Sequence, residues 1–256
     1  MSAQDGDDMP RWFLGGLRTR PDRISLLCLP HAGGAASSYR TWLRDLTPHV
    51  DVLPIQLPGR ENRMSVPFAE SLDALVADLT TVIGRAGLTD LALFGHSMGA
   101  VLATRLCGAL EQSGRPVRHL FVSGHFGTGP WPTDARLIAP PTATDEDLLR
   151  SLAILDPAAA LRYGHAELAA LILPILRADL RLLHGTSLAD VTVDAPVTAL
   201  AGTDDPVVVD LAGWAGVSRT DHALYRLPGN HFYLTSQGPE LSRIVCHRLG
   251  LPVGVP

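Results

Sequence analysis

Lysine is absent from this chain of 256 residues, so all 21 of its basic residues are arginine, against 26 acidic residues. The formal net charge is −5, and no long basic run interrupts this acidic balance. Proteins that bind nucleic acid carry clustered basic residues, because the phosphate backbone attracts them. The composition therefore excludes nucleic acid as a partner.

Cysteine is scarce: Cys28, Cys107 and Cys246 are an odd number, far apart, and no CxxC pair occurs. A disulfide framework needs paired cysteines, and a structural zinc site needs closely spaced ligands. We therefore expect three buried free thiols and no bound metal.

Long apolar runs are also missing, since none approaches the roughly 18 residues that cross a bilayer. Residues 1–10 are acidic and polar, unlike the charged and apolar regions of a signal peptide. From these two absences we expect a cytoplasmic protein that does not contact a membrane.

What is present is an ordinary globular composition, with 46% hydrophobic and 18% charged residues. A chain of this length can bury a sizeable core as one domain of the larger kind. No repeat, low-complexity block or linker-like stretch divides it. We predict a single domain over residues 1–256.

Short apolar runs alternate with helical patterns along most of the chain. The runs are too short for helices and are bounded mainly by Gly, Pro, Asp or His, which indicates buried strands. Apolar residues at helical spacing lie between them, and this alternation predicts an α/β fold with a mostly parallel sheet covered on both faces. The predicted strands are 24–29, 50–55, 91–94, 120–123, 197–201 and 223–227, and the predicted helices between them include 71–85 and 98–112.

Residues 124–188 interrupt this rhythm, because no strand pattern occurs there. Thr144, followed by three acidic residues, predicts a helix start. A second helix is predicted over residues 167–183, bent or interrupted at Pro174. This helical insertion forms either a lid over an active site or additional packing. Its place between two strands of the sheet favours the lid.

A Gly-His-Ser-Met-Gly segment at residues 95–99 lies between a predicted strand and a predicted helix. This is the context of the nucleophile elbow of α/β-hydrolases, in which a tight turn lifts the serine hydroxyl out of the sheet. The flanking glycines let neighbouring backbone pass without a Cβ clash. We therefore predict the α/β-hydrolase fold with Ser97 as nucleophile.

A serine hydroxyl needs a general base at neutral pH. In this fold the acid and then the histidine follow the serine along the chain. His231 lies in a turn after the last predicted strand, from which it can reach Ser97. Four other histidines are weaker candidates, because they lie at a strand start, in the last helix or in the insertion: His222, His247, His165 and His184.

Two neighbouring carboxylates, Asp204 and Asp205, follow the strand at residues 197–201. The acid orients the imidazole and stabilises its protonated form. Asp205, three residues after Gly202 and before a proline, has the position usual for this acid. Asp204 is the alternative, with a turn or capping role if Asp205 is the acid.

The oxyanion hole of this fold combines the amide after the nucleophile with an amide from the loop after an early strand. The first is that of Met98. The second loop is Leu-Pro-His-Ala-Gly-Gly-Ala at residues 29–35, and we predict Ala32 as its donor. Small residues there allow backbone N–H groups to approach a developing negative charge, worth roughly 3 kcal/mol each.

Several of these segments occur in the order seen in one family. They are residues 29–35, Gln-Leu-Pro-Gly-Arg-Glu-Asn-Arg at 56–63, the elbow at 95–99, Leu-Pro-Ile-Leu-Arg-Ala-Asp at 173–179, and Gly-Asn-His-Phe at 229–232. Over nearly its whole length the chain resembles the type II thioesterases that accompany polyketide synthases and nonribosomal peptide synthetases. Segments 29–35 and 56–63 are the most specific, because many hydrolases share the elbow.

This resemblance implies that the chain hydrolyses stalled or misprimed acyl groups from the phosphopantetheine thiol of carrier proteins. Ser97, Asp205 and His231 would form the triad, Ala32 and Met98 the oxyanion hole, and the insertion a lid over the acyl chamber. No cofactor is implied, and the partners are acyl or peptidyl carrier domains. The alternatives are a small-molecule esterase, an acyltransferase or cyclase, and a non-catalytic carrier-binding module.

Three departures from the family affect substrate preference and carrier docking rather than the triad. Asn230 replaces the usual glycine before the histidine, and asparagine tolerates left-handed backbone. His-Phe-Gly-Thr at residues 125–128 replaces an Arg-Ala-Pro-like segment, and residues 151–160 lack a glycine-rich turn. Arg60 and Arg63 are either contacts for an acidic carrier or members of loop salt bridges.

Overall fold

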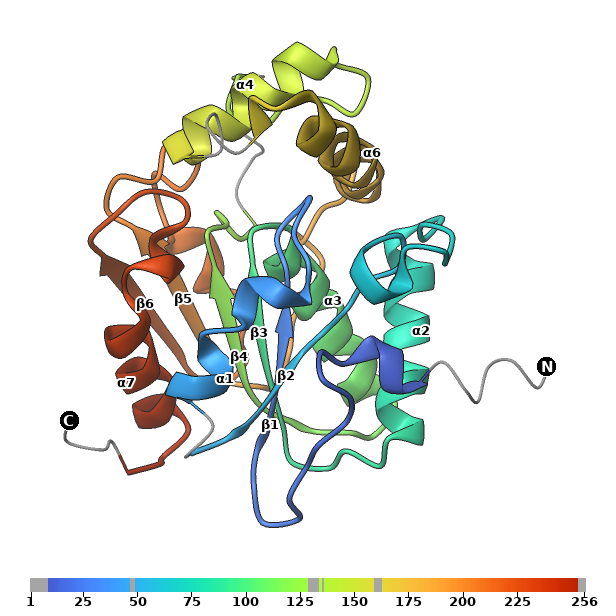
Figure 1. The fold of residues 1–256 in the computed structure, drawn as a ribbon. Helices are drawn as coiled ribbons and strands as arrows, with labels where there is room; N and C mark the ends of the chain where they lie inside the picture. The colour runs from blue at the N-terminus through green and yellow to red at the C-terminus, as the bar shows by residue number, and fades with distance from the viewer. Residues whose placement is uncertain (1–8, 47–48, 129–133, 135, 159–162, 253–256) are drawn as a thin grey trace.

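The computed structural model describes residues 9–46, 49–128, 134, 136–158 and 163–252. Within these ranges the chain forms a six-stranded parallel sheet with helices on both faces (Figure 1), which confirms the predicted α/β-hydrolase fold class. The expectation for the amino terminus depends largely on residues 1–8, which lie outside the described residues, as do residues 159–160 of the stretch without a glycine-rich turn.

The elements closely follow the sequence predictions. The strands are β1 Ser25–Leu29, β2 Asp51–Pro54, β3 Leu91–His96, β4 Val117–Ser123, β5 Val197–Gly202 and β6 His222–Leu227. The α-helices are α1 Trp42–Asp45, α2 Leu72–Arg85, α3 Met98–Gln112, α4 Asp145–Leu155, α6 Ala166–Leu183 and α7 Gly238–Arg248. Short 3-10 helices are η1 Met9–Trp12, η2 Ala36–Tyr39, η3 Glu61–Arg63, η4 Ala212–Trp214 and η5 Tyr233–Thr235.

The strand order β2-β1-β3-β4-β5-β6 places a topological switch point between β1 and β3. From β1 the chain crosses to β2 on one side, and from β3 it crosses to β4 on the other. The loops that follow β1 and β3 therefore diverge, which opens a crevice at the carboxyl edge of the sheet. Both sequence-predicted oxyanion segments and the serine elbow meet at this crevice.

Alternate side chains of strands β1 to β5 pack into two apolar layers, whereas alternate residues of the edge strand β6 are exposed. Leu27 and Leu29 of β1 join the cluster that α2 and α3 cover, whereas Leu26 and Cys28 join the cluster that α1 and α7 cover. All five residues of β1 are buried. Strands buried on both faces are near-continuous apolar runs, which explains why these segments could be read from the sequence.

Helices α4 and α6 lie above the carboxyl ends of the strands (Figure 1), and they contact the layer that α2 and α3 cover through Leu155 of α4 and through Leu182 and Leu183 of α6. They pack against each other in an apolar cluster of their own, which includes Leu148, Leu173 and Leu176. Thr144 caps α4 by accepting the amide hydrogen of Asp147, as its sequence predicts. The alternative that the second helix is interrupted is wrong, because α6 continues through Pro174.

The three cysteines are buried free thiols, as expected. No helix in the described ranges is long and apolar enough to cross a membrane.

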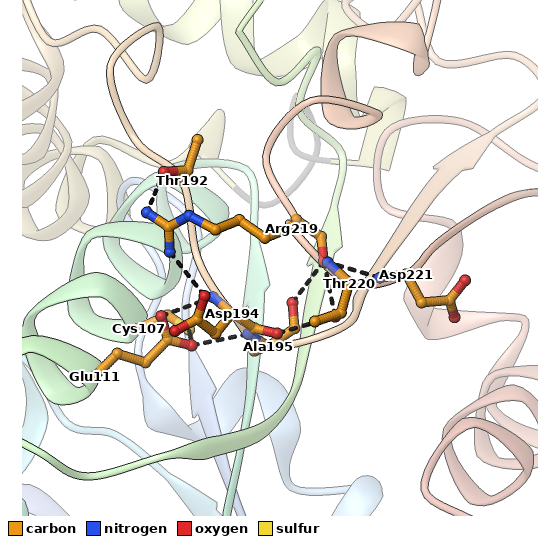
Figure 2. Close-up of polar contacts among 9 residues, drawn as sticks. Cys107, Glu111, Thr192, Asp194, Ala195, Arg219, Thr220 and Asp221 are labelled. Atoms are coloured by element: carbon orange, nitrogen blue, oxygen red, sulfur yellow. Dashed lines mark hydrogen bonds and ion pairs between the residues drawn. The ribbon is translucent and has the colours of Figure 1, made fainter.

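A polar network fixes the start of β5 at the edge of the sheet opposite the crevice (Figure 2). The Glu111 carboxylate, at the end of α3, accepts the amide hydrogens of Asp194 and Ala195, both at 2.8 Å. Arg219 donates to the side chains of Asp194 and Thr192 from the segment that leads into β6. The Glu111 side chain thus joins α3 to the residues that precede β5.

We expect Glu111→Ala to lower the free energy of unfolding by about 1–3 kcal/mol, because two backbone donors lose a charged acceptor. For a domain of this size that is a fall in Tm of roughly 3–10 °C, measurable by thermal unfolding. The matched control is Glu146→Ala, which removes a carboxylate from an exposed pair with Arg150 and should have a much smaller effect. Equal effects of the two substitutions would contradict the role given to Glu111.

Candidate active site

Ser97 lies in a strained turn between β3 and α3. Its φ of 55° and ψ of −115° fall in a region that residues with a Cβ rarely adopt. A Cβ on Gly95 would lie 1.9 Å from the carbonyl oxygen of Gly99, and one on Gly99 would lie 2.1 Å from that of Leu29. Both glycines are therefore required by close backbone approach, and the Ser97 amide is held by the carbonyl oxygen of Ser123 at 2.7 Å.

His231 and Asp205 are brought together in the crevice. Nδ1 of His231 lies 2.8 Å from Oδ2 of Asp205, and the other carboxylate oxygen accepts the amide hydrogen of Val207 at 2.9 Å. Both side chains are buried. The carboxylate thus assigns the imidazole proton to Nδ1, which leaves Nε2 as the proton acceptor.

Asp204 has a different position. Its residue is exposed, and its amide donates to the carbonyl oxygen of Gly229 at 3.0 Å. The geometry gives Asp204 a turn role and pairs Asp205 with the imidazole. The four competing histidines, His165, His184, His222 and His247, are exposed and do not line the cavity that contains Ser97.

Ser97 and His231 line the same cavity, between the sheet edge and the two overlying helices. Ala32 and Met98 lie at its floor. Its roof is mainly apolar, and it comprises Leu148, Leu152 and Leu155 of α4 and Leu176, Leu180 and Leu183 of α6. Among the described residues that line the cavity, none is Asp, Glu or Arg.

The loop after β1 reaches the cavity through His31 and Ala32. The Gly33 amide donates to Oδ2 of Asp179 at 2.8 Å, and the Gly34 amide donates to the carbonyl oxygen of His31 at 2.9 Å. These two amides are engaged, whereas Ala32 lines the cavity beside Met98, the first residue of α3. Amides in the first turn of a helix lack intrahelical acceptors, so they point toward the crevice.

A buried ion pair holds this loop in place. Arg60 donates two hydrogen bonds to the carboxylate of Asp179, both at 2.7 Å, and a third to the carbonyl oxygen of Gly34 at 2.8 Å. The side chains of Arg60 and Asp179 are 4% and 1% exposed. Asp179 belongs to α6, so one pair joins the overlying helix, the loop after β1 and the loop after β2.

This burial decides between the two alternatives for Arg60 and Arg63, contact with an acidic carrier or loop salt bridges. Arg60 is enclosed by the pair, which makes the loop salt bridge the right interpretation. Arg63 is also buried, with its guanidinium 3.7 Å above the ring of Trp12 and one nitrogen donating to the carbonyl oxygen of Gln56. Neither guanidinium is available to a partner.

Asn230 also differs from expectation, because left-handed backbone is not needed there. Gly229 adopts the unusual φ of +125°, while Ser97 and Glu61 are the non-glycine residues with positive φ in the described chain. Instead, Oδ1 of Asn230 accepts the amide hydrogen of Phe232 at 2.9 Å. The asparagine therefore closes the turn that carries His231.

Sequence reasoning missed a hydrogen-bonded relay behind the imidazole. Nδ1 of His96 lies 3.0 Å from the Ser123 hydroxyl, which lies 2.7 Å from the Tyr233 hydroxyl. The His96 ring centroid is 4.9 Å from that of His231. Burial, and then the nearby His231, lower the pKa of His96 well below its usual value, so a neutral ring lies beside the His231 imidazole. The only local signal was polar residues at the ends of β3 and β4.

Within the described residues, no three His, Cys, Asp or Glu side chains are grouped so that they could hold a metal ion.

Fold and site together define a protein of the α/β-hydrolase fold: a parallel sheet, a strained serine turn at its switch point and a hydrogen-bonded His–Asp pair beside it. Residues 24–249 match the family model for the thioesterase domain. The chain belongs to this thioesterase family and is a hydrolase that acts on thioesters.

The similarity to known relatives extends over almost the whole chain. Gramicidin S biosynthesis protein GrsT of Aneurinibacillus migulanus is 30% identical, with 94% of each chain covered. Thioesterase PikA5 of Streptomyces venezuelae is 32% identical, covering 91% of this chain and 83% of its own. The structure of the type II thioesterase BorB from the borrelidin biosynthetic cluster aligns with a TM-score of 0.80 at 33% identity, covering 91% of this chain and 95% of BorB. The similarity to type II thioesterases predicted from the motifs is confirmed.

The buried Arg60–Asp179 pair predicts that its effect on stability can be separated from its effect on activity. Asp179→Ala leaves the Arg60 guanidinium buried without a counter-charge, so we expect a loss of about 3–5 kcal/mol in the free energy of unfolding. Replacing both residues, as Arg60→Met with Asp179→Leu, should recover much of that loss. Both variants should still lose roughly 10²-fold or more in kcat, because the Gly33 amide has lost its acceptor and the loop beside Ala32 is no longer held.

Urea unfolding and steady-state hydrolysis of an acyl thioester measure the two effects on the same preparations. A double variant with wild-type kcat would show that Asp179 has no part in positioning the loop.

Proposed function

We propose that this thioesterase removes stalled or misprimed acyl groups from the phosphopantetheine thiol of carrier proteins in a polyketide or nonribosomal peptide pathway. The observation that carries the proposal is the His231–Asp205 pair, joined at 2.8 Å, on the wall of the same cavity as the strained Ser97. The names of the relatives, which include a gramicidin S biosynthesis protein and a borrelidin-cluster type II thioesterase, support the choice of pathway.

The reaction begins when Oγ of Ser97 attacks the thioester carbonyl carbon and Nε2 of His231 takes the hydroxyl proton. Asp205 stabilises the imidazolium through Nδ1. The C–S bond breaks, and His231 returns the proton to the departing sulfur. His231 then takes a proton from water as its oxygen attacks the acyl-enzyme, and it gives that proton to Oγ as the carboxylic acid leaves.

The charge on the carbonyl oxygen in each tetrahedral intermediate meets the amides of Met98 and Ala32. Because these donors belong to the backbone of a helix start and of a loop tied down by Asp179, little reorganisation is needed as the charge develops. The mechanism requires no cofactor of this chain's own, since the phosphopantetheine arrives with the carrier.

Within a single domain, residues 124–188 serve as the lid in this proposal, and the leucines of α4 and α6 form the wall of the acyl chamber. The apolar lining suits a hydrocarbon chain. The acyl or peptidyl carrier domain docks outside the chamber, at a surface other than the buried Arg60 and Arg63. Three free, buried thiols fit a reducing, cytoplasmic location.

Replacing the nucleophile tests the mechanism. We expect Ser97→Ala to lower kcat for acyl thioesters by ~10⁶-fold, because members of a triad act as a unit. A fluorophosphonate probe should label the wild type and not the variant, with intact folding checked by circular dichroism. A folded wild type that the probe does not label would favour a non-catalytic carrier-binding role, and a loss of activity below tenfold would place the nucleophile elsewhere.

Substrate choice tests the assignment to carrier proteins. Acyl-loaded carrier, the matching acyl-N-acetylcysteamine and the p-nitrophenyl ester of the same acid are compared by kcat/KM. We expect the carrier-bound thioester to be hydrolysed with the highest kcat/KM, since docking adds binding energy to the same chemistry. Turnover of the oxygen ester without turnover of loaded carrier would identify a small-molecule esterase. Release of a cyclised or transferred product would identify a cyclase or acyltransferase.

A further inference from the structure

One face of α4 carries a polar residue where its pattern calls for an apolar one. Leu148, Leu152 and Leu155 line the chamber at helical spacing, and Ser151 lies on the same face. Positions three and four residues apart share a face of a helix, so Ser151 lies within the leucine stripe rather than beside it. The Ser151 side chain itself lines the chamber.

The hydroxyl of Ser151 is buried and has no hydrogen-bond partner among the residues that the structure describes. The residue is 7% exposed, and its Oγ makes no hydrogen bond in the structure, including the back-bond to the carbonyl one turn earlier that helical serines often make. A buried hydroxyl without a partner is unfavourable, and alanine at this position would avoid the cost. The described residues therefore supply no group that satisfies this hydroxyl.

The surroundings indicate what kind of group this is. Among the described residues that line the chamber there is no Asp, Glu or Arg, so these residues offer no counter-charge to an ion. His125 contributes a second polar side chain: its Nδ1 accepts the amide hydrogen of Gly127 at 3.1 Å, which places the ring proton on Nε2. Burial lowers the pKa of His125 to about 3, so the ring is neutral at pH 7. A neutral oxygen fits this lining, and a carboxylate does not.

We propose that Ser151 is a specificity-determining residue that hydrogen-bonds a neutral oxygen substituent, a hydroxyl or a keto group, on the acyl chain in the chamber. The preferred substrates are then oxygenated acyl groups rather than saturated chains of the same length. This inference rests on the proposed function, because it takes the chamber beside Ser97 as the acyl site. A site that hydrogen-bonds a substrate oxygen discriminates against the analogue that lacks it, since its own polar group is then left unpaired.

The test compares N-acetylcysteamine thioesters in matched pairs: a saturated chain, and the same chain with a hydroxyl or keto group at C3 or at C5. In the wild type we expect kcat/KM to be higher for the oxygenated member of at least one pair. Ser151→Ala should reduce that ratio about five- to tenfold, the worth of one neutral hydrogen bond, while Ser151→Thr, which keeps the hydroxyl, should retain most of it. The matched control is Ser242→Ala, the same substitution on α7 away from the chamber, and it should leave the ratio unchanged.

A merely structural role for Ser151 would change kcat/KM for both members of a pair equally, so the ratio separates recognition from stability. An unchanged ratio in Ser151→Ala for every position of the oxygen would overturn the proposal.

A binding measurement separates this proposal from the proposed function. Non-hydrolysable amide analogues of the same pairs are titrated into Ser97→Ala and into Ser97→Ala combined with Ser151→Ala. A preference for the oxygenated analogue that disappears in the double variant would support recognition by Ser151 even if no thioester were hydrolysed. Equal affinities for both analogues in the single variant would overturn recognition, whatever the catalytic result.

Discussion

The carboxylate of Asp179 is the point on which the geometry of the site depends. It accepts two hydrogen bonds from Arg60 and one from the Gly33 amide, so a single buried anion joins α6, the loop after β1 and the loop after β2. Desolvating both charges is expensive, and an apolar pair would serve stability as well. What the ion pair provides is positioning. The Gly33 amide, next to the Ala32 amide that we propose as an oxyanion donor, is fixed by a carboxylate that cannot move without leaving Arg60 unpaired.

The floor of the site is rigid for a different reason. Ser97 adopts its strained backbone because β3 and α3 are both anchored in the apolar layers, and because Gly95 and Gly99 admit backbone atoms within about 2 Å of where a Cβ would lie. Strain of this kind persists only where the surrounding structure over-determines it. The His231 turn is closed by Asn230 and backed by the relay from His96 through Ser123 to Tyr233. The Ser97 turn and the His231 turn are therefore held from the sheet, whereas the loop that carries Ala32 is held by α6 through Asp179.

The sequence predicted those parts of the molecule that local patterns encode. Strands buried on both faces, such as β1 and β3, appear as apolar runs, and the elbow appears as glycines around Ser97. It did not predict the partners of Arg60 or His96, because residues 119 and 27 positions away supply them and no period links such pairs. Asp179 belongs to the segment 173–179 that resembles the thioesterase family, yet its burial follows from tertiary packing. The burial of Ser151 was likewise not predicted, since a serine in a helix is ordinarily a surface residue.

The sheet edge and the overlying helices therefore have different parts in the proposed function. In the proposed mechanism the chemistry lies on the sheet edge, whereas the acyl chain meets α4 and α6, which pack against each other in an apolar cluster. A substitution such as a serine within the leucine stripe can therefore alter what the chamber recognises without disturbing Ser97 or His231. Asp179 is where the two parts meet, because it belongs to α6 and holds the loop that carries Ala32. In the proposed mechanism, a shift of α6 that follows the bound acyl chain would reach the loop that carries Ala32 through this carboxylate, which would link chamber occupancy to transition-state stabilisation.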